Sequence, residues 1–121
     1  MSLTILIADD SKLSRKSLIK NLPQDLQYDI IEASNGKEAI QLLKTDPLDL
    51  LILDLTMPEV DGIAVLEFIN TWGYTLPVIV ISADFQPKRQ EQIQALGFKH
   101  FIKKPFNEDQ LALALFELKL I

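Results

Sequence analysis

Short apolar runs recur along the chain and end in polar or turn-forming residues. Runs of this length without polar alternation are typical of strands that are buried on both faces of a parallel sheet. The pattern predicts five strands, at Leu3–Ala8, Tyr28–Ala33, Asp49–Asp54, Pro77–Ser82 and Lys99–Lys103.

Each strand is followed by a segment with helical spacing. In the first such segment Leu18 and Leu22 are expected to face the core with Leu13 beside them, while Arg15 is expected to face solvent. The pattern predicts five helices, at Ser11–Leu22 (N-capped by Asp10 or Ser11), Gly36–Thr45, Gly62–Trp72, Pro87–Leu96, and Asn107 to about Lys119. Strands alternating with helices predict one α/β domain over residues 1–121, with helices on both faces of the sheet.

The last helix carries more apolar surface than a surface helix needs. One apolar stripe is enough to pack a helix on a sheet. Two stripes are present here, Leu111, Ala114, Leu115 and Leu118 in the first, and Leu113, Phe116 and Leu120 in the second. We expect the second stripe to be covered by a partner protein, a second copy of the chain or a further domain. A frayed, partly exposed terminus is the alternative.

Composition narrows the class of protein. The 121 residues are 48% hydrophobic, carry a formal charge of −5 and include no cysteine, which excludes disulfides and thiol chemistry. Basic residues gather only in short groups such as Lys88–Arg89 and Lys103–Lys104, so we expect no direct nucleic-acid binding. The sequence shows neither a signal peptide nor an apolar run that would span a membrane. We expect a cytoplasmic domain with no membrane partner.

Polar side chains stand where the predicted strands end. Asp9 and Asp10 follow the first strand, Asp54 ends the third, Ser82 ends the fourth and Lys104 follows the fifth. The carboxyl ends of parallel strands share one edge of the sheet, where reactive groups gather. If the first strand lies next to the third, these side chains converge. Individually, each has a plainer interpretation as a helix cap, a strand-end hydroxyl or a solvated surface charge.

The chemistry of such a cluster is restricted. Neighbouring carboxylates cannot all stay ionised without a counter-charge, and several oxygen ligands suit Mg²⁺. A lysine and a hydroxyl beside the ion would neutralise and bind the oxygens of a phosphoryl group. Asp54 is then the best-placed nucleophile and would form an aspartyl phosphate.

These motifs closely resemble the receiver domains of two-component response regulators, above all those of the chemotaxis type. The motifs are Asp9-Asp10, Asp54-x-x-Met57-Pro58-x-x-Asp61-Gly62, Ser82-Ala83 and Lys104-Pro105-Phe106, and the resemblance covers the whole chain. It implies a flavodoxin-like (βα)5 three-layer sandwich whose five-stranded parallel sheet has the order 2-1-3-4-5.

The resemblance also implies a role for each site residue. Asp54 would be the phosphoacceptor, and Mg²⁺ would be held by Asp9, Asp10, Asp54 and the backbone carbonyl of Thr56. Lys104 and Ser82 would bind phosphoryl oxygens, and the bond between Lys104 and Pro105 would be cis. Phe101 would be the aromatic switch, acting by packing alone because it lacks the commoner tyrosine hydroxyl. Thr56 and Asp84 would tune the lifetime of the phosphoryl group.

The implied partners are a sensor histidine kinase or a phosphotransfer domain, and a downstream target or an output domain missing from this sequence. A homodimer could form through the surface of the fourth helix, fifth strand and fifth helix. The domain would be a signalling receiver that catalyses only its own phosphorylation and dephosphorylation. A phosphatase-like hydrolase would need a substrate cap and an acid two residues after Asp54, where Thr56 stands. A binding module that has lost phosphorylation would not need the complete acidic set.

Overall fold

Strands and helices alternate throughout the chain, as the spacing of apolar residues predicts. The computed structural model describes residues 2–57, 60–83 and 86–121. The strands are β1 (Leu3–Ala8), β2 (Tyr28–Ala33), β3 (Leu50–Asp54), β4 (Val78–Ser82) and β5 (Phe101–Lys103). The helices are α1 (Lys12–Lys20), α2 (Gly36–Thr45), α3 (Gly62–Trp72), α4 (Pro87–Ala95) and α5 (Glu108–Glu117).

The strands form one parallel sheet in the order β2-β1-β3-β4-β5, which confirms the predicted topology. The register pairs Ala8 with Leu53 on the two central strands, and Asp54 with Ile81 on β3 and β4. Because all strands point the same way, their carboxyl ends lie together at one edge. The residues that follow β1, β3, β4 and β5 therefore start from neighbouring positions.

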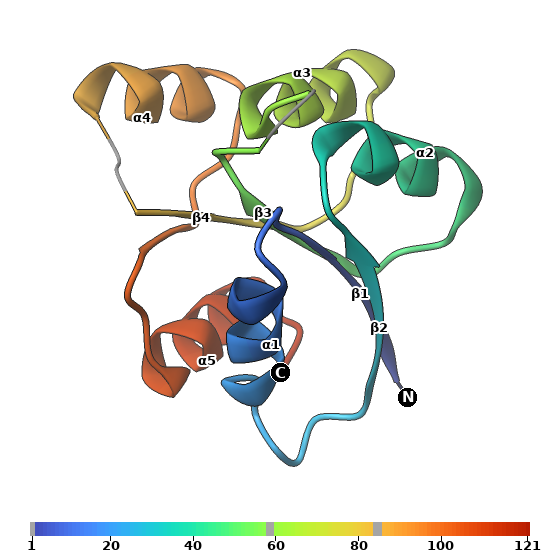
Figure 1. The fold of residues 1–121 in the computed structure, drawn as a ribbon, viewed down its shortest axis with the longest axis vertical. Coiled ribbons are helices and arrows are strands. Elements are labelled where there is room, and N and C mark those ends of the chain that lie inside the picture. The colour runs from blue at the N-terminus through green and yellow to red at the C-terminus, as the bar shows by residue number, and fades with distance from the viewer. Residues whose placement is uncertain (1, 58–59, 84–85) are drawn as a thin grey trace.

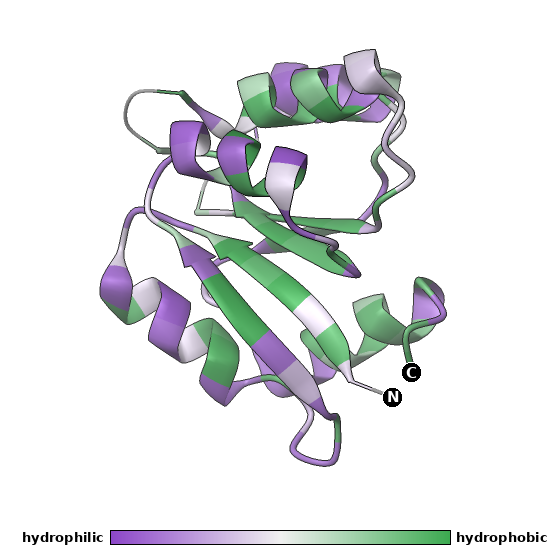
Figure 2. Cartoon of the chain, turned by 90° about the vertical axis from the view of Figure 1, so that its right-hand side faces the viewer, coloured by the Kyte–Doolittle hydropathy of each residue, from purple (hydrophilic) through white to green (hydrophobic). Residues whose placement is uncertain are grey.

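Helices cover both faces of the sheet. Figure 1 shows α2, α3 and α4 on one side of the strands, and α1 and α5 on the other. The hydropathy colouring in Figure 2 shows the central strands as almost continuously hydrophobic, as expected for strands that are covered on both sides. The molecule is the predicted three-layer sandwich.

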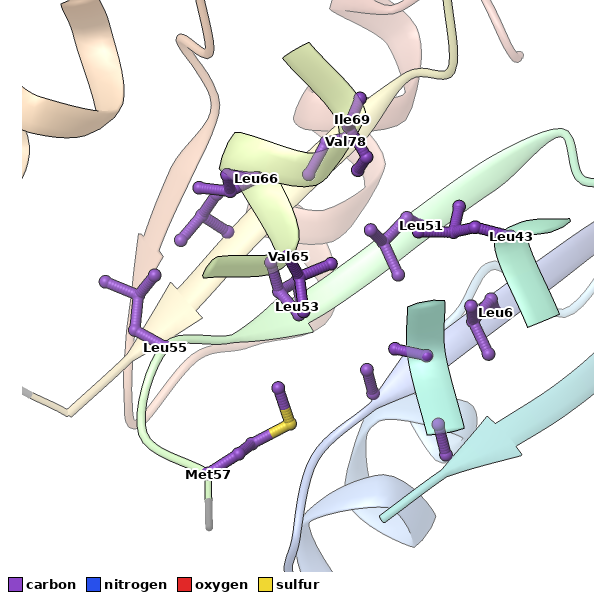
Figure 3. Close-up of a cluster of buried hydrophobic side chains, with 14 of the residues drawn as sticks. Leu6, Leu43, Leu51, Leu53, Leu55, Met57, Val65, Leu66, Ile69 and Val78 are labelled. Atoms are coloured by element: carbon purple, nitrogen blue, oxygen red, sulfur yellow. The ribbon is translucent and has the colours of Figure 1, made fainter. Parts of the chain in front are cut away.

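Alternate residues of each central strand pack into two separate hydrophobic cores, one on each face of the sheet. Leu51 and Leu53 of β3 pack with Val65 and Leu66 of α3 in the core shown in Figure 3. Leu50 and Ile52 point the other way, into the core formed with α1 and α5. The loop residue Met57 is also buried in the first core, so the segment after Asp54 is attached to the sheet by packing.

Polar side chains cap four of the helices. Ser11, Asn35, Asp61 and Asn107 each accept a hydrogen bond from a backbone N–H in the first turn of the helix that follows. These bonds satisfy N–H groups that have no partner within the helix. Ser11 rather than Asp10 is the cap of α1, and this leaves the Asp10 side chain available at the sheet edge.

The structure corrects three expectations about side-chain orientation. Strand β2 is half-buried, and its Asp29 and Glu32 are exposed because β2 is an edge strand. Leu13 was expected beside the core, but it is 79% exposed. Arg15 was expected in solvent, but its side chain is only 14% exposed and pairs with Glu32.

Candidate functional site

Two aspartates are buried side by side at the carboxyl edge of the sheet. Asp9 follows β1 and is 1% exposed, and Asp54 ends the adjacent strand β3 and is 6% exposed. Asp10 is exposed next to them. One carboxylate oxygen from each of the three residues lies within 4.8 Å of the others. The predicted convergence of these acids is therefore present.

The carboxylate of Asp9 is held by several donors. Its Oδ1 accepts the backbone N–H of Ser11 at 2.9 Å, and its Oδ2 accepts the hydroxyl of Ser14 at 2.5 Å. The ammonium of Lys104 donates to the same Oδ2 at 3.0 Å. Arg15 donates to the backbone carbonyl of Asp9 at 2.6 Å. Asp9 is thus fixed by the first turn of α1 and by a residue from the far end of the chain.

Lys104 connects the two buried aspartates. Its Nζ is 3.0 Å from Oδ2 of Asp9 and 3.9 Å from Oδ2 of Asp54. The backbone N–H of Lys104 donates to the carbonyl of Ser82 at 2.8 Å, which joins the end of β5 to the end of β4. The peptide bond between Lys104 and Pro105 is cis, as the resemblance implies.

The pKa of the Asp54 carboxyl is raised from its ordinary value of 3.8 to about 6, chiefly by burial and next by the negative charge of Asp9. Lys104 and the backbone N–H of Thr56 act in the opposite direction, and Asp10 adds a smaller upward contribution. The lysine therefore only partly compensates the acidic cluster. A second positive charge would complete the compensation.

The donor set fits a magnesium ion. Asp9, Asp10 and Asp54 supply hard carboxylate oxygens that converge within a distance one cation can span. Because Lys104 only partly neutralises the negative charge around Asp54, a divalent cation would be attracted to the same place. These three residues are the ones that would hold Mg²⁺.

The remaining predicted residues surround this cluster. Ser82 is buried at the end of β4, and Thr56 is exposed two residues after Asp54. Phe101 is half-buried on β5 and packs against the core under α3 and α4. Asp84 and Pro58 lie outside the described residues.

Sequence reasoning missed the contacts made by the first turn of α1. Ser14 and Arg15 both touch Asp9, and Arg15 is held in turn by Glu32 at 2.7 Å. Helical phase contains a signal for this arrangement. Ser14 lies four residues and Arg15 three residues before Leu18, which is buried on the same helix. Both side chains therefore lie close to the core-facing stripe of the helix.

The fold and the site together define a doubly wound α/β domain with an acidic cluster at the carboxyl edge of its parallel sheet. The model of the response regulator receiver domain family matches residues 5–116. The chain belongs to this family, and it is a receiver domain of the response regulators that act in two-component signalling.

Individual relatives agree with this assignment. Chemotaxis protein CheY of Listeria monocytogenes is 37% identical over 114 residues, which cover 93% of this chain and 95% of CheY. Response regulator GtcR of Aneurinibacillus migulanus is 40% identical over 107 residues, which cover 88% of this chain but only 43% of GtcR. Among solved structures, the receiver domain of the Francisella response regulator 1452 is similar, with a TM-score of 0.84 and 28% identity, over 96% of this chain and 95% of that one.

None of the helices within residues 2–57, 60–83 and 86–121 is long and apolar enough to cross a membrane.

Proposed function

We propose that this receiver accepts a phosphoryl group on Asp54 from a phosphohistidine of a sensor histidine kinase or a phosphotransfer domain. The observation that carries the proposal is the position of Asp54, which is buried between Asp9 and Lys104 at the edge of the sheet. A carboxylate with partly compensated charge and a cation-binding neighbourhood is suited to nucleophilic phosphoryl transfer.

The transfer exchanges one bond at phosphorus for another. A carboxylate oxygen of Asp54 attacks the phosphorus atom, the bond from phosphorus to the imidazole nitrogen breaks, and its electron pair stays on the imidazole. Mg²⁺, held by Asp9, Asp10, Asp54 and the carbonyl of Thr56, would neutralise charge on the phosphoryl oxygens. Asp9 and Lys104 are already oriented toward the acceptor before the reaction.

Lys104 would change partners when Asp54 is phosphorylated. Its ammonium is closer to Asp9 than to Asp54, at 3.0 Å against 3.9 Å. A phosphoryl group on Asp54 brings more negative charge to the same place and attracts the ammonium toward it. Ser82, at the end of the adjacent strand, would bind a second phosphoryl oxygen.

These rearrangements would switch the surface formed by α4, β5 and α5. Ser82 pairs in register with Lys103, next to Lys104, and Val80 pairs with Phe101. Movement of Ser82 toward the phosphoryl group would therefore act on the strand that carries Phe101. The half-buried Phe101 would turn inward by packing alone. Moving such an equilibrium from mostly off to mostly on takes about 5.5 kcal/mol of differential stabilisation.

The signal would end by hydrolysis. Water attacks phosphorus, the bond from phosphorus to Asp54 breaks, and inorganic phosphate and the free carboxylate are released. Thr56 and Asp84, each two residues beyond a site residue, would tune this rate. The domain would catalyse only its own phosphorylation and dephosphorylation.

The biological partners follow from the same proposal. Residues 1–121 would form one receiver domain, working in the cytoplasm, that controls a downstream target protein or an output domain. The relatives include both a protein about as long as this chain and a much longer one, because the match spans nearly all of CheY but less than half of GtcR. The switched surface could also pair with a second copy of the chain.

Labelling with acetyl phosphate tests the proposal. Wild type should become labelled in the presence of Mg²⁺, and Asp54→Asn should not. Asp61→Asn is a matched control, because it removes a nearby carboxylate while an asparagine can still cap α3. Equal labelling of wild type and Asp54→Asn would reject Asp54 as the acceptor. Steady turnover of a small phosphate ester would favour the hydrolase, and failure to bind beryllofluoride with Mg²⁺ would favour a binding module.

A further inference from the structure

The first turn of α1 supplies a hydroxyl to the acidic site in addition to the helix cap. Ser11 is the N-cap, and its hydroxyl accepts the N–H of Ser14 at 3.2 Å. Ser14 directs its own hydroxyl to Oδ2 of Asp9 at 2.5 Å. The hydroxyl of Ser14 therefore serves the site, since capping of the helix is already provided by Ser11.

The orientation of the Asp9 carboxylate is set from several directions. Oδ2 accepts both Ser14 and Lys104, and Oδ1 accepts the N–H of Ser11. A carboxylate oxygen has two lone-pair sites. Ser14 and Lys104 occupy both sites of Oδ2, and Ser11 occupies one site of Oδ1, so that one site of Oδ1 is left for a cation or its water. Lys104 is expected to leave Asp9 when phosphate arrives, whereas Ser14 stays in place on its helix.

We propose that Ser14 is a positioning residue for the cation site: its hydroxyl holds the Asp9 carboxylate in the orientation that serves Mg²⁺, whether directly or through a bound water. The inference rests on the proposed cation site and adds a residue that sequence reasoning missed. Hydrogen bonds that orient ligating carboxylates typically change metal affinity by about 10–100-fold when they are removed.

If Ser14 had a purely structural role in α1, its replacement would affect the helix and not the binding of Mg²⁺. Serine is a weaker helix former than alanine by a few tenths of a kcal/mol, because its hydroxyl competes for backbone hydrogen bonds. If Ser14 only completed the helix, Ser14→Ala would leave cation affinity unchanged and would not lower stability. If Ser14 positions Asp9, the same substitution weakens Mg²⁺ binding.

Threonine and valine at position 14 provide an isosteric comparison. Both are β-branched and cost the helix about the same, but only threonine keeps the hydroxyl. Mg²⁺ titrations by calorimetry on the full chain should give Ser14→Thr an affinity within about threefold of wild type and Ser14→Val an affinity about tenfold weaker. Ser14→Ala, which adds no methyl group, should also be about tenfold weaker. Ser17→Ala, at an exposed position one turn later, should match wild type.

The outcomes separate this inference from the function on which it rests. Circular dichroism confirms first that every variant is folded. If wild type binds Mg²⁺ and Ser14→Val and Ser14→Ala bind it equally well, Ser14 has no positioning role and the cation site stands. If Ser14→Thr binds as weakly as Ser14→Val while Ser14→Ala binds normally, crowding explains the loss and the inference is overturned. If wild type shows no saturable Mg²⁺ binding, the cation site fails and this inference fails with it.

Discussion

At the scale of single residues, the site has more negative charge than its own lysine can neutralise. Burial and the charge of Asp9 raise the pKa of the Asp54 carboxyl, whereas Lys104 and the N–H of Thr56 lower it. Its pKa of about 6 means that the ionised form is less favourable in the folded protein than in the unfolded chain. The feature that suits Asp54 to bind a cation therefore destabilises the metal-free fold.

We expect Asp54→Asn to be more stable than wild type in the absence of Mg²⁺ at pH 8. The folded-state pKa is raised, so the folded protein binds a proton more tightly than the unfolded chain does. Wild-type stability should fall as pH rises from about 4 to about 6 and then stay level. The gain for the variant at pH 8 should be about 1–2 kcal/mol, after allowance for solvent screening at the open edge of the site.

Urea denaturation at pH 4 and pH 8 checks this. The gap between wild type and Asp54→Asn should be much smaller at pH 4, where the carboxyl is protonated in the folded state and about half protonated in the unfolded chain. Adding Mg²⁺ at pH 8 should stabilise wild type more than the variant, with NaCl at matched ionic strength as the control. A variant that is no more stable than wild type at pH 8 contradicts the electrostatic account.

The acidic site could be predicted from the sequence because the parallel topology of the sheet brings its residues together. Asp9, Asp54, Ser82 and Lys104 need only lie at strand ends of a parallel sheet to meet at one edge. Ser14 could not be assigned in this way, since its contact depends on helical phase relative to the neighbouring strand. Arg15 was misplaced because its charge was given more weight than its helical phase, although it lies three residues before the buried Leu18 on the same helix.

At the scale of elements, α3 is placed by a close backbone approach at its first residue. A Cβ on Gly62 would lie 2.7 Å from the carbonyl oxygen of Asp54 and 2.7 Å from Cα of Leu55. The N–H of Gly62 donates to the carbonyl of Leu55 at 3.0 Å. The glycine thus lets the helix start directly against the end of the strand that carries Asp54.

Gly62→Ala should therefore destabilise the domain even though alanine is the better helix former. The methyl group meets backbone rather than a flexible side chain, and overpacking of this type typically costs about 1–3 kcal/mol. Urea denaturation measures the loss, and acetyl phosphate labelling should slow because the displaced backbone belongs to Asp54. Asn70→Ala, at an exposed position of the same helix, should be neutral or slightly stabilising. Unchanged stability of Gly62→Ala would show that β3 and α3 separate easily.

The end of α5 shows the reverse case, a side chain where glycine would fit better. Lys119 has a φ of 61°, and the next N–H, of Leu120, donates to the carbonyl of Leu115 at 2.9 Å. This is the geometry of a helix end that usually contains glycine.

Lys119→Gly should stabilise the domain by about 0.5–1 kcal/mol, since relief of the left-handed conformation exceeds the added entropy of the unfolded chain. Lys119→Ala removes the same charge but keeps the Cβ, and it should give no such gain. Thermal denaturation of the two variants side by side decides whether backbone conformation or charge is responsible. Equal effects of both substitutions would exclude the conformational explanation.

The predicted elements mostly match the observed ones because burial on both faces leaves strands with uninterrupted apolar runs. The edge strands are the exceptions: β2 carries the exposed Asp29 and Glu32, and β5 ends in the exposed Lys103. The positions of these strands in the sheet were known only from the resemblance. Leu13 was assigned to the core although it lies about 140° around the helix from Leu18. Residue spacing supports a prediction only when all members of the proposed stripe share a phase.

At the scale of the whole molecule, α5 retains the second apolar stripe that the sequence predicts. Leu111, Ala114 and Leu115 are buried against the sheet, while Leu113 is 59% exposed and Phe116 is 66% exposed. Leu120 differs from the other members of the second stripe, since it packs against the core. The exposed pair lies on the surface that phosphorylation is proposed to switch.

The charges of this surface are arranged so that two copies can complement each other. The first turn of α4 carries Lys88 and Arg89, so that this helix has a net positive charge despite Glu91, and α5 carries Glu108, Asp109 and Glu117. In a two-fold arrangement the basic helix of one copy can face the acidic helix of the other, around the apolar pair. A second copy is therefore the cover that can be tested with this chain alone.

We expect beryllofluoride with Mg²⁺ to drive wild type from monomer to dimer in sedimentation velocity, and the double variant Leu113→Ser with Phe116→Ser to stay monomeric. Both side chains are largely exposed in the monomer, so the variant should still fold and bind beryllofluoride. Trp72→Ser, which removes a 70% exposed side chain from α3, controls for apolar surface elsewhere and should dimerise like wild type.

A wild type that remains monomeric when loaded would exclude a second copy, and the exposed pair would then be assigned to a different protein or to an output domain. Dimerisation of the double variant would instead place the interface on another face, because the apolar centre of the proposed one is gone.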